Sequence, residues 1–147
     1  MPQSPAKSPA QSSAQFRPRQ IHYVLENGGY RLTAPYQFYT GIKGYVVNTR
    51  PEAPGGYIKL SSSGVMEIGR NTWWNGPSGP AVDTANFLRA SLVHDMLYHL
   101  IAVGAIRKKH RKTADKLLRE IAKEDGMTWW RRSYAWLGVR IFGRFYT

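Results

Sequence analysis

Residues 83–104, DTANFLRASLVHDMLYHLIAVG, begin the part of the chain in which helical patterns replace strand patterns. Asp83 or Thr84 is suited to cap the N-terminus of a helix, and Gly104 is suited to end it. We therefore predict a helix that runs from this cap to about Val103.

Two further helices are predicted after this one. A basic linker, residues 107–112, follows the first helix. Thr113 can cap a second helix that ends near Asp125, directly before a glycine. Thr128 can cap a third helix that ends near Phe142, again directly before a glycine. The second half of the chain is therefore predicted to be helical.

The chain before residue 83 carries strand patterns. Residues 30–40 are rich in aromatic and β-favouring side chains, although Pro35 argues against a central strand. Residues 45–47 form another short β run. Residues 57–60 and 65–68 flank a Ser-Ser-Ser-Gly stretch, which predicts a β-hairpin.

Prolines and glycines mark two loops, at residues 48–56 and 73–80, and we expect no regular element in the second. With strands first and helices second, the predicted fold class is α+β. It consists of N-terminal short antiparallel strands and a hairpin, followed by about three packed helices. Residues 1–20 are predicted to be a flexible arm because Ser, Pro, Gln and Ala dominate them, and residues 21–147 are predicted to be a single α+β domain.

The composition limits the classes of binding partner and the cellular compartment that suit this chain. The chain has 21 Lys and Arg residues and 9 acidic residues, which gives a net charge of +12. This charge favours nucleic acid, anionic lipid or an acidic protein as the binding partner. The absence of cysteine excludes disulfides and thiolate metal sites and fits a reducing compartment. The N-terminus does not have the pattern of a signal peptide, and no apolar run is long enough to span a bilayer.

A candidate catalytic set lies on the first two predicted helices. His94 and Tyr98 are four residues apart and share one helical face. Asp115 lies at the edge of the apolar stripe of the second helix, so antiparallel packing would bring it to His94. An imidazole held by a carboxylate and a phenol is a plausible general base.

Asp95 is the candidate metal ligand. It projects about a quarter-turn away from His94 and is free to bind a cation near the glycine-rich loop of residues 74–80. Calcium suits such a site because it takes carboxylate and backbone carbonyl oxygens as ligands.

Other interpretations of these residues remain open. A His-Asp pair in a helix is usually structural, and the set could be a buried polar network that fixes helix packing. A metal phosphohydrolase would need more ligands than His22, His99 and His110 offer, and is the weakest interpretation. The glycine-rich loop lacks the lysine of a P-loop, and residues 107–112 are read as a solvated linker rather than a nucleic-acid patch.

The C-terminus mixes aromatic side chains with arginines. Trp129, Trp136, Phe145 and Tyr146 are predicted to lie outside the core, either at a protein interface or at a membrane surface. We favour the protein interface.

About half of the chain resembles a phage and prophage family catalogued only as a domain of unknown function. The resemblance is carried by WNGPSGP at residues 74–80, DT at 83–84, RASLVHDMLY at 89–98, RKTADKLL at 111–118, and the tail 134–143 with VRIFG.

A second resemblance is to phospholipase A2 enzymes, especially the cysteine-free viral ones. His94-Asp95-Met96-Leu97-Tyr98 is similar to their His-Asp-x-x-Tyr motif, and Asp115 to the acid of their next helix. The loop that starts at Trp74 is similar to their calcium loop, although Trp74 stands where they have Tyr and Ser78 is an added residue.

The second resemblance implies water-mediated hydrolysis of an ester. His94 would activate water, with Tyr98 and Asp115 orienting it. Calcium would be held by Asp95 and by loop carbonyls, for which Trp74, Gly76 and Gly79 are the candidates.

The function expected from both resemblances is a virion- or lysis-associated, calcium-dependent hydrolase of phospholipase A2 type. The alternative is a non-catalytic structural protein of a phage particle in the tail, neck or connector. Expected partners are other phage structural proteins, an anionic phospholipid membrane, or a second copy of the chain. Binding of a specific nucleic acid is not expected, because no nucleic-acid-binding module is visible. The expected location is the virion or the cytoplasm of the infected bacterium.

Overall fold

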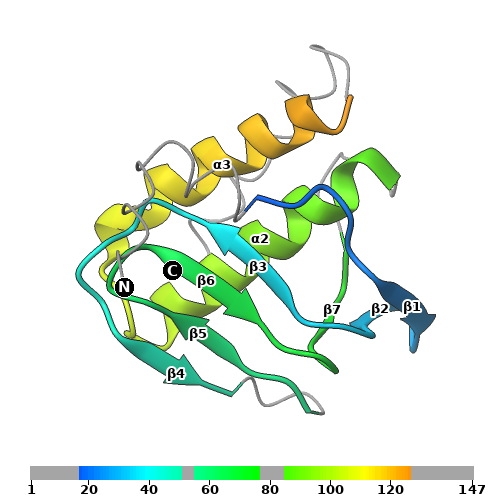
Figure 1. The fold of residues 1–147 in the computed structure, drawn as a ribbon, viewed down its shortest axis with the longest axis horizontal. Coiled ribbons are helices and arrows are strands. Elements are labelled where there is room, and N and C mark those ends of the chain that lie inside the picture. Colours follow the sequence, from blue (N-terminus) through cyan, green and yellow to red (C-terminus); the bar gives the residue numbers. More distant parts are fainter. Residues whose placement is uncertain (1–16, 51–54, 77–84, 127–147) are drawn as a thin grey trace, which may run out of the picture.

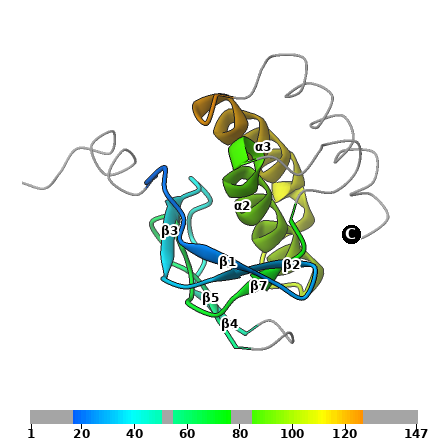
Figure 2. The ribbon, with the colours of Figure 1, turned by 90° about the vertical axis from the view of Figure 1, so that its right-hand side faces the viewer.

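A computed structural model describes residues 17–50, 55–76 and 85–126. Two antiparallel β-sheets form one side of the molecule, and two α-helices lie side by side against them (Figures 1 and 2). One core of buried apolar side chains joins both layers. Within this arrangement the two helices pack closely against each other.

The strands are short and fall into two sheets. The first sheet has the order β1-β2-β7 and the second has the order β3-β6-β5-β4. Their bounds are β1 Tyr23–Glu26, β2 Gly29–Leu32, β3 Tyr36–Tyr39, β4 Val47–Thr49, β5 Ile58–Leu60, β6 Val65–Ile68 and β7 Trp73–Trp74.

The hairpin predicted around the Ser-Ser-Ser-Gly stretch is confirmed. β5 pairs antiparallel with β6, with Leu60 opposite Met66 and Ile58 opposite Ile68. These four side chains are buried, whereas Lys59 between two of them is exposed. Alternation of apolar and polar residues therefore directs one face of the hairpin into the core.

The predicted fold class is wrong. Within the described residues the chain forms seven strands in two antiparallel sheets and two α-helices, which is a mostly β fold with the helices late in the sequence. The strands have two to four residues each, so they carry too little periodicity to reveal how many there are. The predicted third helix, near residues 128–142, lies outside the described residues, as do residues 1–16 of the predicted arm.

The strand pattern predicted at residues 30–40 is divided between β2 and β3, and β1 appears where no strand was predicted. β1 and β2 form a hairpin whose two-residue turn, Asn27-Gly28, has positive φ angles of 53° and 75°. Asn-Gly is the most characteristic pair for such a turn, and this signal in the sequence was missed. The expectation of no regular element from residue 73 onward is wrong for Trp73 and Trp74, which pair with β2.

The helices follow the predictions more closely than the strands do. The first, α2, spans Ala85–Ala102, and Gly104 after it has a φ of +76°. The second, α3, spans Arg111–Glu124 and begins two residues before the predicted cap at Thr113. The residues predicted as a basic linker instead form a short 3-10 helix, η1 Lys108–His110, and the first turn of α3.

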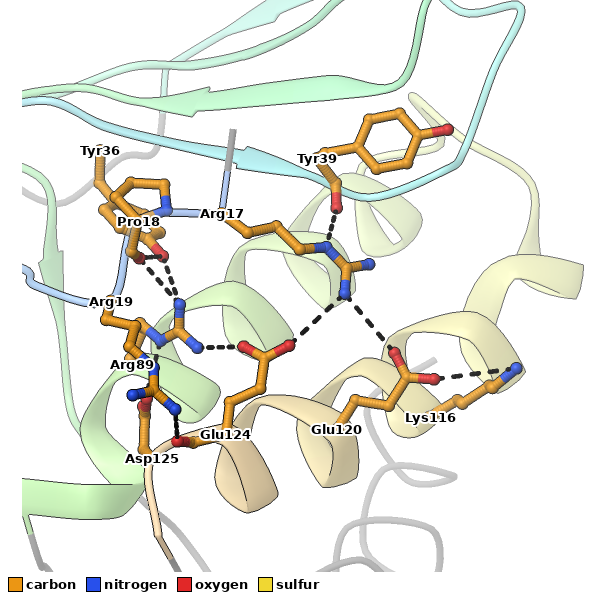
Figure 3. Close-up of polar contacts among 10 residues, drawn as sticks. All are labelled: Arg17, Pro18, Arg19, Tyr36, Tyr39, Arg89, Lys116, Glu120, Glu124 and Asp125. Carbon is orange, nitrogen blue, oxygen red and sulfur yellow. Dashed lines mark hydrogen bonds and ion pairs between the residues drawn. The ribbon is translucent and has the colours of Figure 1, made fainter. Parts of the chain in front are cut away.

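A buried arginine ties the N-terminal segment to both helices (Figure 3). Arg89 on α2 has only 2% of its side chain exposed and forms ion pairs with Glu124 and Asp125 at the end of α3. It also donates a hydrogen bond of 2.8 Å to the carbonyl oxygen of Pro18 and one of 3.3 Å to the hydroxyl of Tyr36. Arg89 therefore connects the N-terminal segment, β3, α2 and α3 at one point.

Arg17 adds a second connection beside it. Its Nε donates a hydrogen bond of 3.1 Å to the carbonyl oxygen of Tyr39, and its guanidinium pairs with Glu120 and Glu124 (Figure 3). Residues 17–19 thus lie against β3 and α3.

Substitution of Gly29 should test the packing of the first sheet. A β-carbon at Gly29 would lie 2.6 Å from the carbonyl oxygen of Trp74 and 2.4 Å from the Trp73 ring. We expect Gly29→Ala to lower the free energy of unfolding by about 1–3 kcal/mol, measured by chemical denaturation, because overpacking forces the backbone to shift. Ser62→Ala on the exposed β5–β6 turn is the control, and equal stability of the two variants would contradict this packing.

Candidate active site

Three predicted site residues meet between α2 and α3. The Nε2 of His94 lies 2.9 Å from Oδ1 of Asp115, and the hydroxyl of Tyr98 donates a hydrogen bond of 2.7 Å to the same oxygen. The rings of His94 and Tyr98 lie 4.2 Å apart. All three side chains are buried. The structure therefore brings together the imidazole, the phenol and the carboxylate as the sequence predicted.

The distribution of apolar residues on the two helices explains why these three side chains meet. α2 is apolar around most of its circumference, so nearly every residue from Phe87 to Ile101 is buried, and His94 and Tyr98 are carried into the interior with them. α3 buries a single stripe, in which Asp115 lies next to Ala114 and Leu118. The buried stripe of α3 faces α2, so Asp115 reaches both His94 and Tyr98, which lie four residues apart on α2.

The hydrogen bond to Asp115 determines which nitrogen of His94 can act as a base. When the ring is neutral, its Nε2–H donates to Asp115, so the lone pair is on Nδ1. Nδ1 lies 3.6 Å from Oδ1 of Asp95, whose side chain keeps 30% of its surface exposed. The basic nitrogen therefore lies on the side of the ring next to the partly exposed Asp95.

The surroundings shift the proton affinities of these groups. Burial lowers the pKa of His94, but the hydrogen bond to Asp115 and the nearby Asp95 carboxylate outweigh it and leave the pKa above its usual value. Burial also raises the pKa of Asp95, against the effect of His94. Burial and the bond to Asp115 raise the pKa of Tyr98 to about 12, so this phenol remains a hydrogen-bond donor at neutral pH.

The start of the predicted calcium loop is attached to the same helix. The indole Nε1 of Trp74 donates a hydrogen bond of 3.2 Å to Ser91 Oγ, and Ser91 lies one turn before Asp95 on α2. Gly76 is buried with a φ of +83°, and a β-carbon there would lie 2.5 Å from the Tyr30 ring. Glycine is therefore required for the turn that follows β7. Gly79 lies outside the described residues.

Two residues near the site were not predicted from the sequence. Ser91 anchors Trp74, as described above. Arg111 was assigned to the linker, but it lies on α3 one turn before Asp115, and its guanidinium is 5.9 Å from the centre of the Tyr98 ring. The spacing of four residues between Arg111 and Asp115 was the available signal, because such residues share a helical face.

The described residues contain neither a cluster of metal ligands nor a membrane-spanning helix. No group of three or more His, Asp or Glu side chains there could hold a metal ion. No helix within 17–50, 55–76 and 85–126 is long and apolar enough to cross a membrane.

The fold and the site together define a small, mostly β protein with a buried His-Asp-Tyr network on a helical hairpin. Residues 80–139, which include all three network residues, match a family described as "Protein of unknown function (DUF1353)". No curated protein and no solved structure matches the chain. The match names no activity, particle or host.

Proposed function

We propose that this chain is a calcium-dependent ester hydrolase of phospholipase A2 type in which His94 is the general base. The observation that supports the proposal most strongly is the Asp115 carboxylate, which accepts hydrogen bonds from both His94 and Tyr98. An imidazole fixed in this way presents Nδ1 as an acceptor beside a partly exposed carboxylate. This is the arrangement that activation of a water molecule requires.

In the proposed reaction, Nδ1 of His94 removes a proton from water while the water oxygen adds to the ester carbonyl carbon. Asp115 stabilises the resulting imidazolium, and Tyr98 keeps the carboxylate in place. His94 then returns the proton to the leaving alkoxide as the carbon–oxygen bond of the ester breaks. The products are a carboxylic acid and an alcohol, and the imidazole is neutral again.

The proposal assigns a calcium ion to the space beside Nδ1 of His94. Asp95 would supply a carboxylate, and the backbone carbonyls of Trp74, Gly76 and Gly79 would complete the ligands. Two observations are compatible with this assignment: Asp95 is partly exposed next to His94, and Trp74 is bonded one turn away on the same helix. When bound, the ion would polarise the ester carbonyl and stabilise the oxyanion.

The setting in a phage, as a virion- or lysis-associated protein, is also part of this proposal. It is supported by the sequence motifs at residues 74–80, 89–98 and 111–118. The proposal also includes other phage proteins as partners, and the same motifs support it.

The test is release of fatty acid from phosphatidylglycerol vesicles with calcium present. We expect His94→Asn to lower the rate by about 10³-fold, because a positioned general base contributes on that order. His22→Asn is the matched control, since His22 is exposed on another part of the surface and should keep full activity. Chelation of calcium should abolish release by the unmodified chain. Equal release by the two variants would disprove the hydrolase.

A non-catalytic structural protein is the second candidate, and one observation favours it. β1 is an edge strand of its sheet, and its Tyr23, Val24 and Leu25 are exposed, Leu25 to 76%. An exposed apolar edge strand is suited to pairing with another chain. On this view the buried His-Asp-Tyr network would fix helix packing without turnover. Co-sedimentation with phage particles together with inactivity of the unmodified chain on vesicles would support it.

A further inference from the structure

Exposed cations lie on the loop between β3 and β4, on the turn between α2 and α3, and on the first turn of α3. Lys43, Arg107, Lys108, Lys109 and Lys112 are all exposed. No carboxylate of the described residues forms an ion pair with any of them, whereas Arg17, Arg31, Arg89 and Lys116 each pair with at least one. Five exposed cations without an ion pair to a described carboxylate therefore lie on these segments.

A tyrosine joins two distant parts of the chain. The hydroxyl of Tyr45 lies 2.9 Å from Nε2 of His110, and the rings of the two residues meet edge to face at 5.4 Å. The backbone nitrogen of Arg107 also lies 3.5 Å from the Tyr45 hydroxyl. Ile42 and Ile106, which flank these contacts in sequence, are buried in the core. The segments around residues 43–46 and 103–112 thus form one surface, which Ile42 and Ile106 anchor in the core.

Exposed valines accompany the cations. Val46, next to Tyr45, has 89% of its surface exposed, and Val103, just after α2, has 54%. Burial together with the charges of Lys109 and Arg107 lowers the pKa of His110, which disfavours its charged form. We name the surface formed by Lys43, Val46, Val103, Lys108, Lys109 and Lys112 the basic end.

We propose that the basic end docks the protein on an anionic lipid surface. Its lysines are placed to contact lipid phosphates, and its two exposed valines are placed to enter the interfacial region between the headgroups. Nucleic acid would satisfy the lysines but would gain nothing from an exposed valine, so the valines favour lipid. The inference does not depend on hydrolysis, because docking requires none of the residues of the His94 network.

Docking can be measured separately from any hydrolysis. The experiment uses the full chain carrying His94→Asn, in the presence of a calcium chelator, and flotation with vesicles of phosphatidylglycerol or of phosphatidylcholine alone. We expect binding to the anionic vesicles that weakens with added salt. Lys108→Glu combined with Lys109→Glu should lower the partition coefficient about tenfold or more, since each cation near an anionic surface contributes substantially.

The matched control changes the charge equally elsewhere. Arg70→Glu combined with Lys123→Glu alters two exposed cations outside the basic end and should lower partitioning much less. An equal decrease in both pairs would overturn the proposal, because it would show that only the net charge matters. Circular dichroism of each variant confirms that the fold is retained.

A site-specific probe decides between lipid and nucleic acid. The chain contains no cysteine, so Val46→Cys creates a single position for an environment-sensitive fluorophore. Its emission should shift to the blue on phosphatidylglycerol vesicles and remain unchanged with a polynucleotide. Val24→Cys on β1, at the other end of the molecule in Figure 1, is the control. A shift at position 24 without one at 46, or a response to polynucleotide alone, would overturn the proposal.

Discussion

Replacement of Asp115 by Asn is expected to slow ester hydrolysis by about 10³-fold, within the range that loss of general-base function causes. Asp115 accepts the Nε2–H of His94, and an amide can instead donate to Nε2 and move the ring proton to Nδ1. In that tautomer Nδ1 cannot take a proton from water. The rate of fatty acid release, compared with that of the His22→Asn control, measures the effect. A variant with full activity would show that Asp115 does not orient His94.

The pH dependence of the same variant should distinguish its effect from a simple loss of structure. The hydrogen bond to Asp115 raises the pKa of His94 against the opposing effect of burial. The proposed reaction requires neutral His94, so the rate of the unmodified chain should rise with pH through this raised pKa. Without the Asp115 carboxylate one of the two acids that raise this pKa is lost, so the rise should move to lower pH in Asp115→Asn. A damaged fold would lower the rate without moving the profile.

Stability should follow the same titration with a defined sign. The pKa of His94 is higher in the folded chain than in the unfolded one, so its contribution to stability is fully present below its ordinary value of about 6.5. That contribution is lost as the pH rises through the raised value. Chemical denaturation at several pH values, without calcium, should show this loss in the unmodified chain and a smaller one in Asp115→Asn.

Replacement of Arg89 by Met should lower the free energy of unfolding by about 3–5 kcal/mol, the cost typical of breaking a buried ion pair. Arg89 is fully enclosed and neutralises Glu124 and Asp125, while it also satisfies the carbonyl oxygen of Pro18. Methionine fills much of the volume but removes the ion-pair partner of Asp125, while Glu124 keeps its pair with Arg17 and the Pro18 carbonyl keeps its hydrogen bond from Tyr36. Chemical denaturation followed by circular dichroism measures the loss.

Arg31→Met is the control for this prediction. Arg31 also forms an ion pair, at 3.0 Å with Glu26, but its side chain is 27% exposed, and exposed pairs typically contribute less than about 1 kcal/mol. If the two variants lose the same stability, Arg89 is not the connection between the helices and the N-terminal segment that its contacts indicate.

Local signals in the sequence were sufficient for the helices and for one hairpin. The glycine after α2 and the apolar content of the helix are local, and they placed α2 within about a residue of its observed end. The hairpin of β5 and β6 was recognised from its turn and its alternating residues. The β-favouring residues at 30–40 and 45–47 indicated β-structure there but not the bounds of β2, β3 and β4, because such short strands carry little periodicity. β7 consists of two tryptophans that are held in a strand by pairing with β2.

The sequence by itself determined the members of the His94 network, because residues four apart on a helix share a face and an acid at the edge of an apolar stripe faces the partner helix. Only the tertiary structure decided that Arg89 would be a buried anchor and that Tyr45 would bind η1. Both depend on contacts between residues separated by 35 or more positions in the chain. Such contacts arise from the packing of complete elements against one another, and no local pattern encodes them.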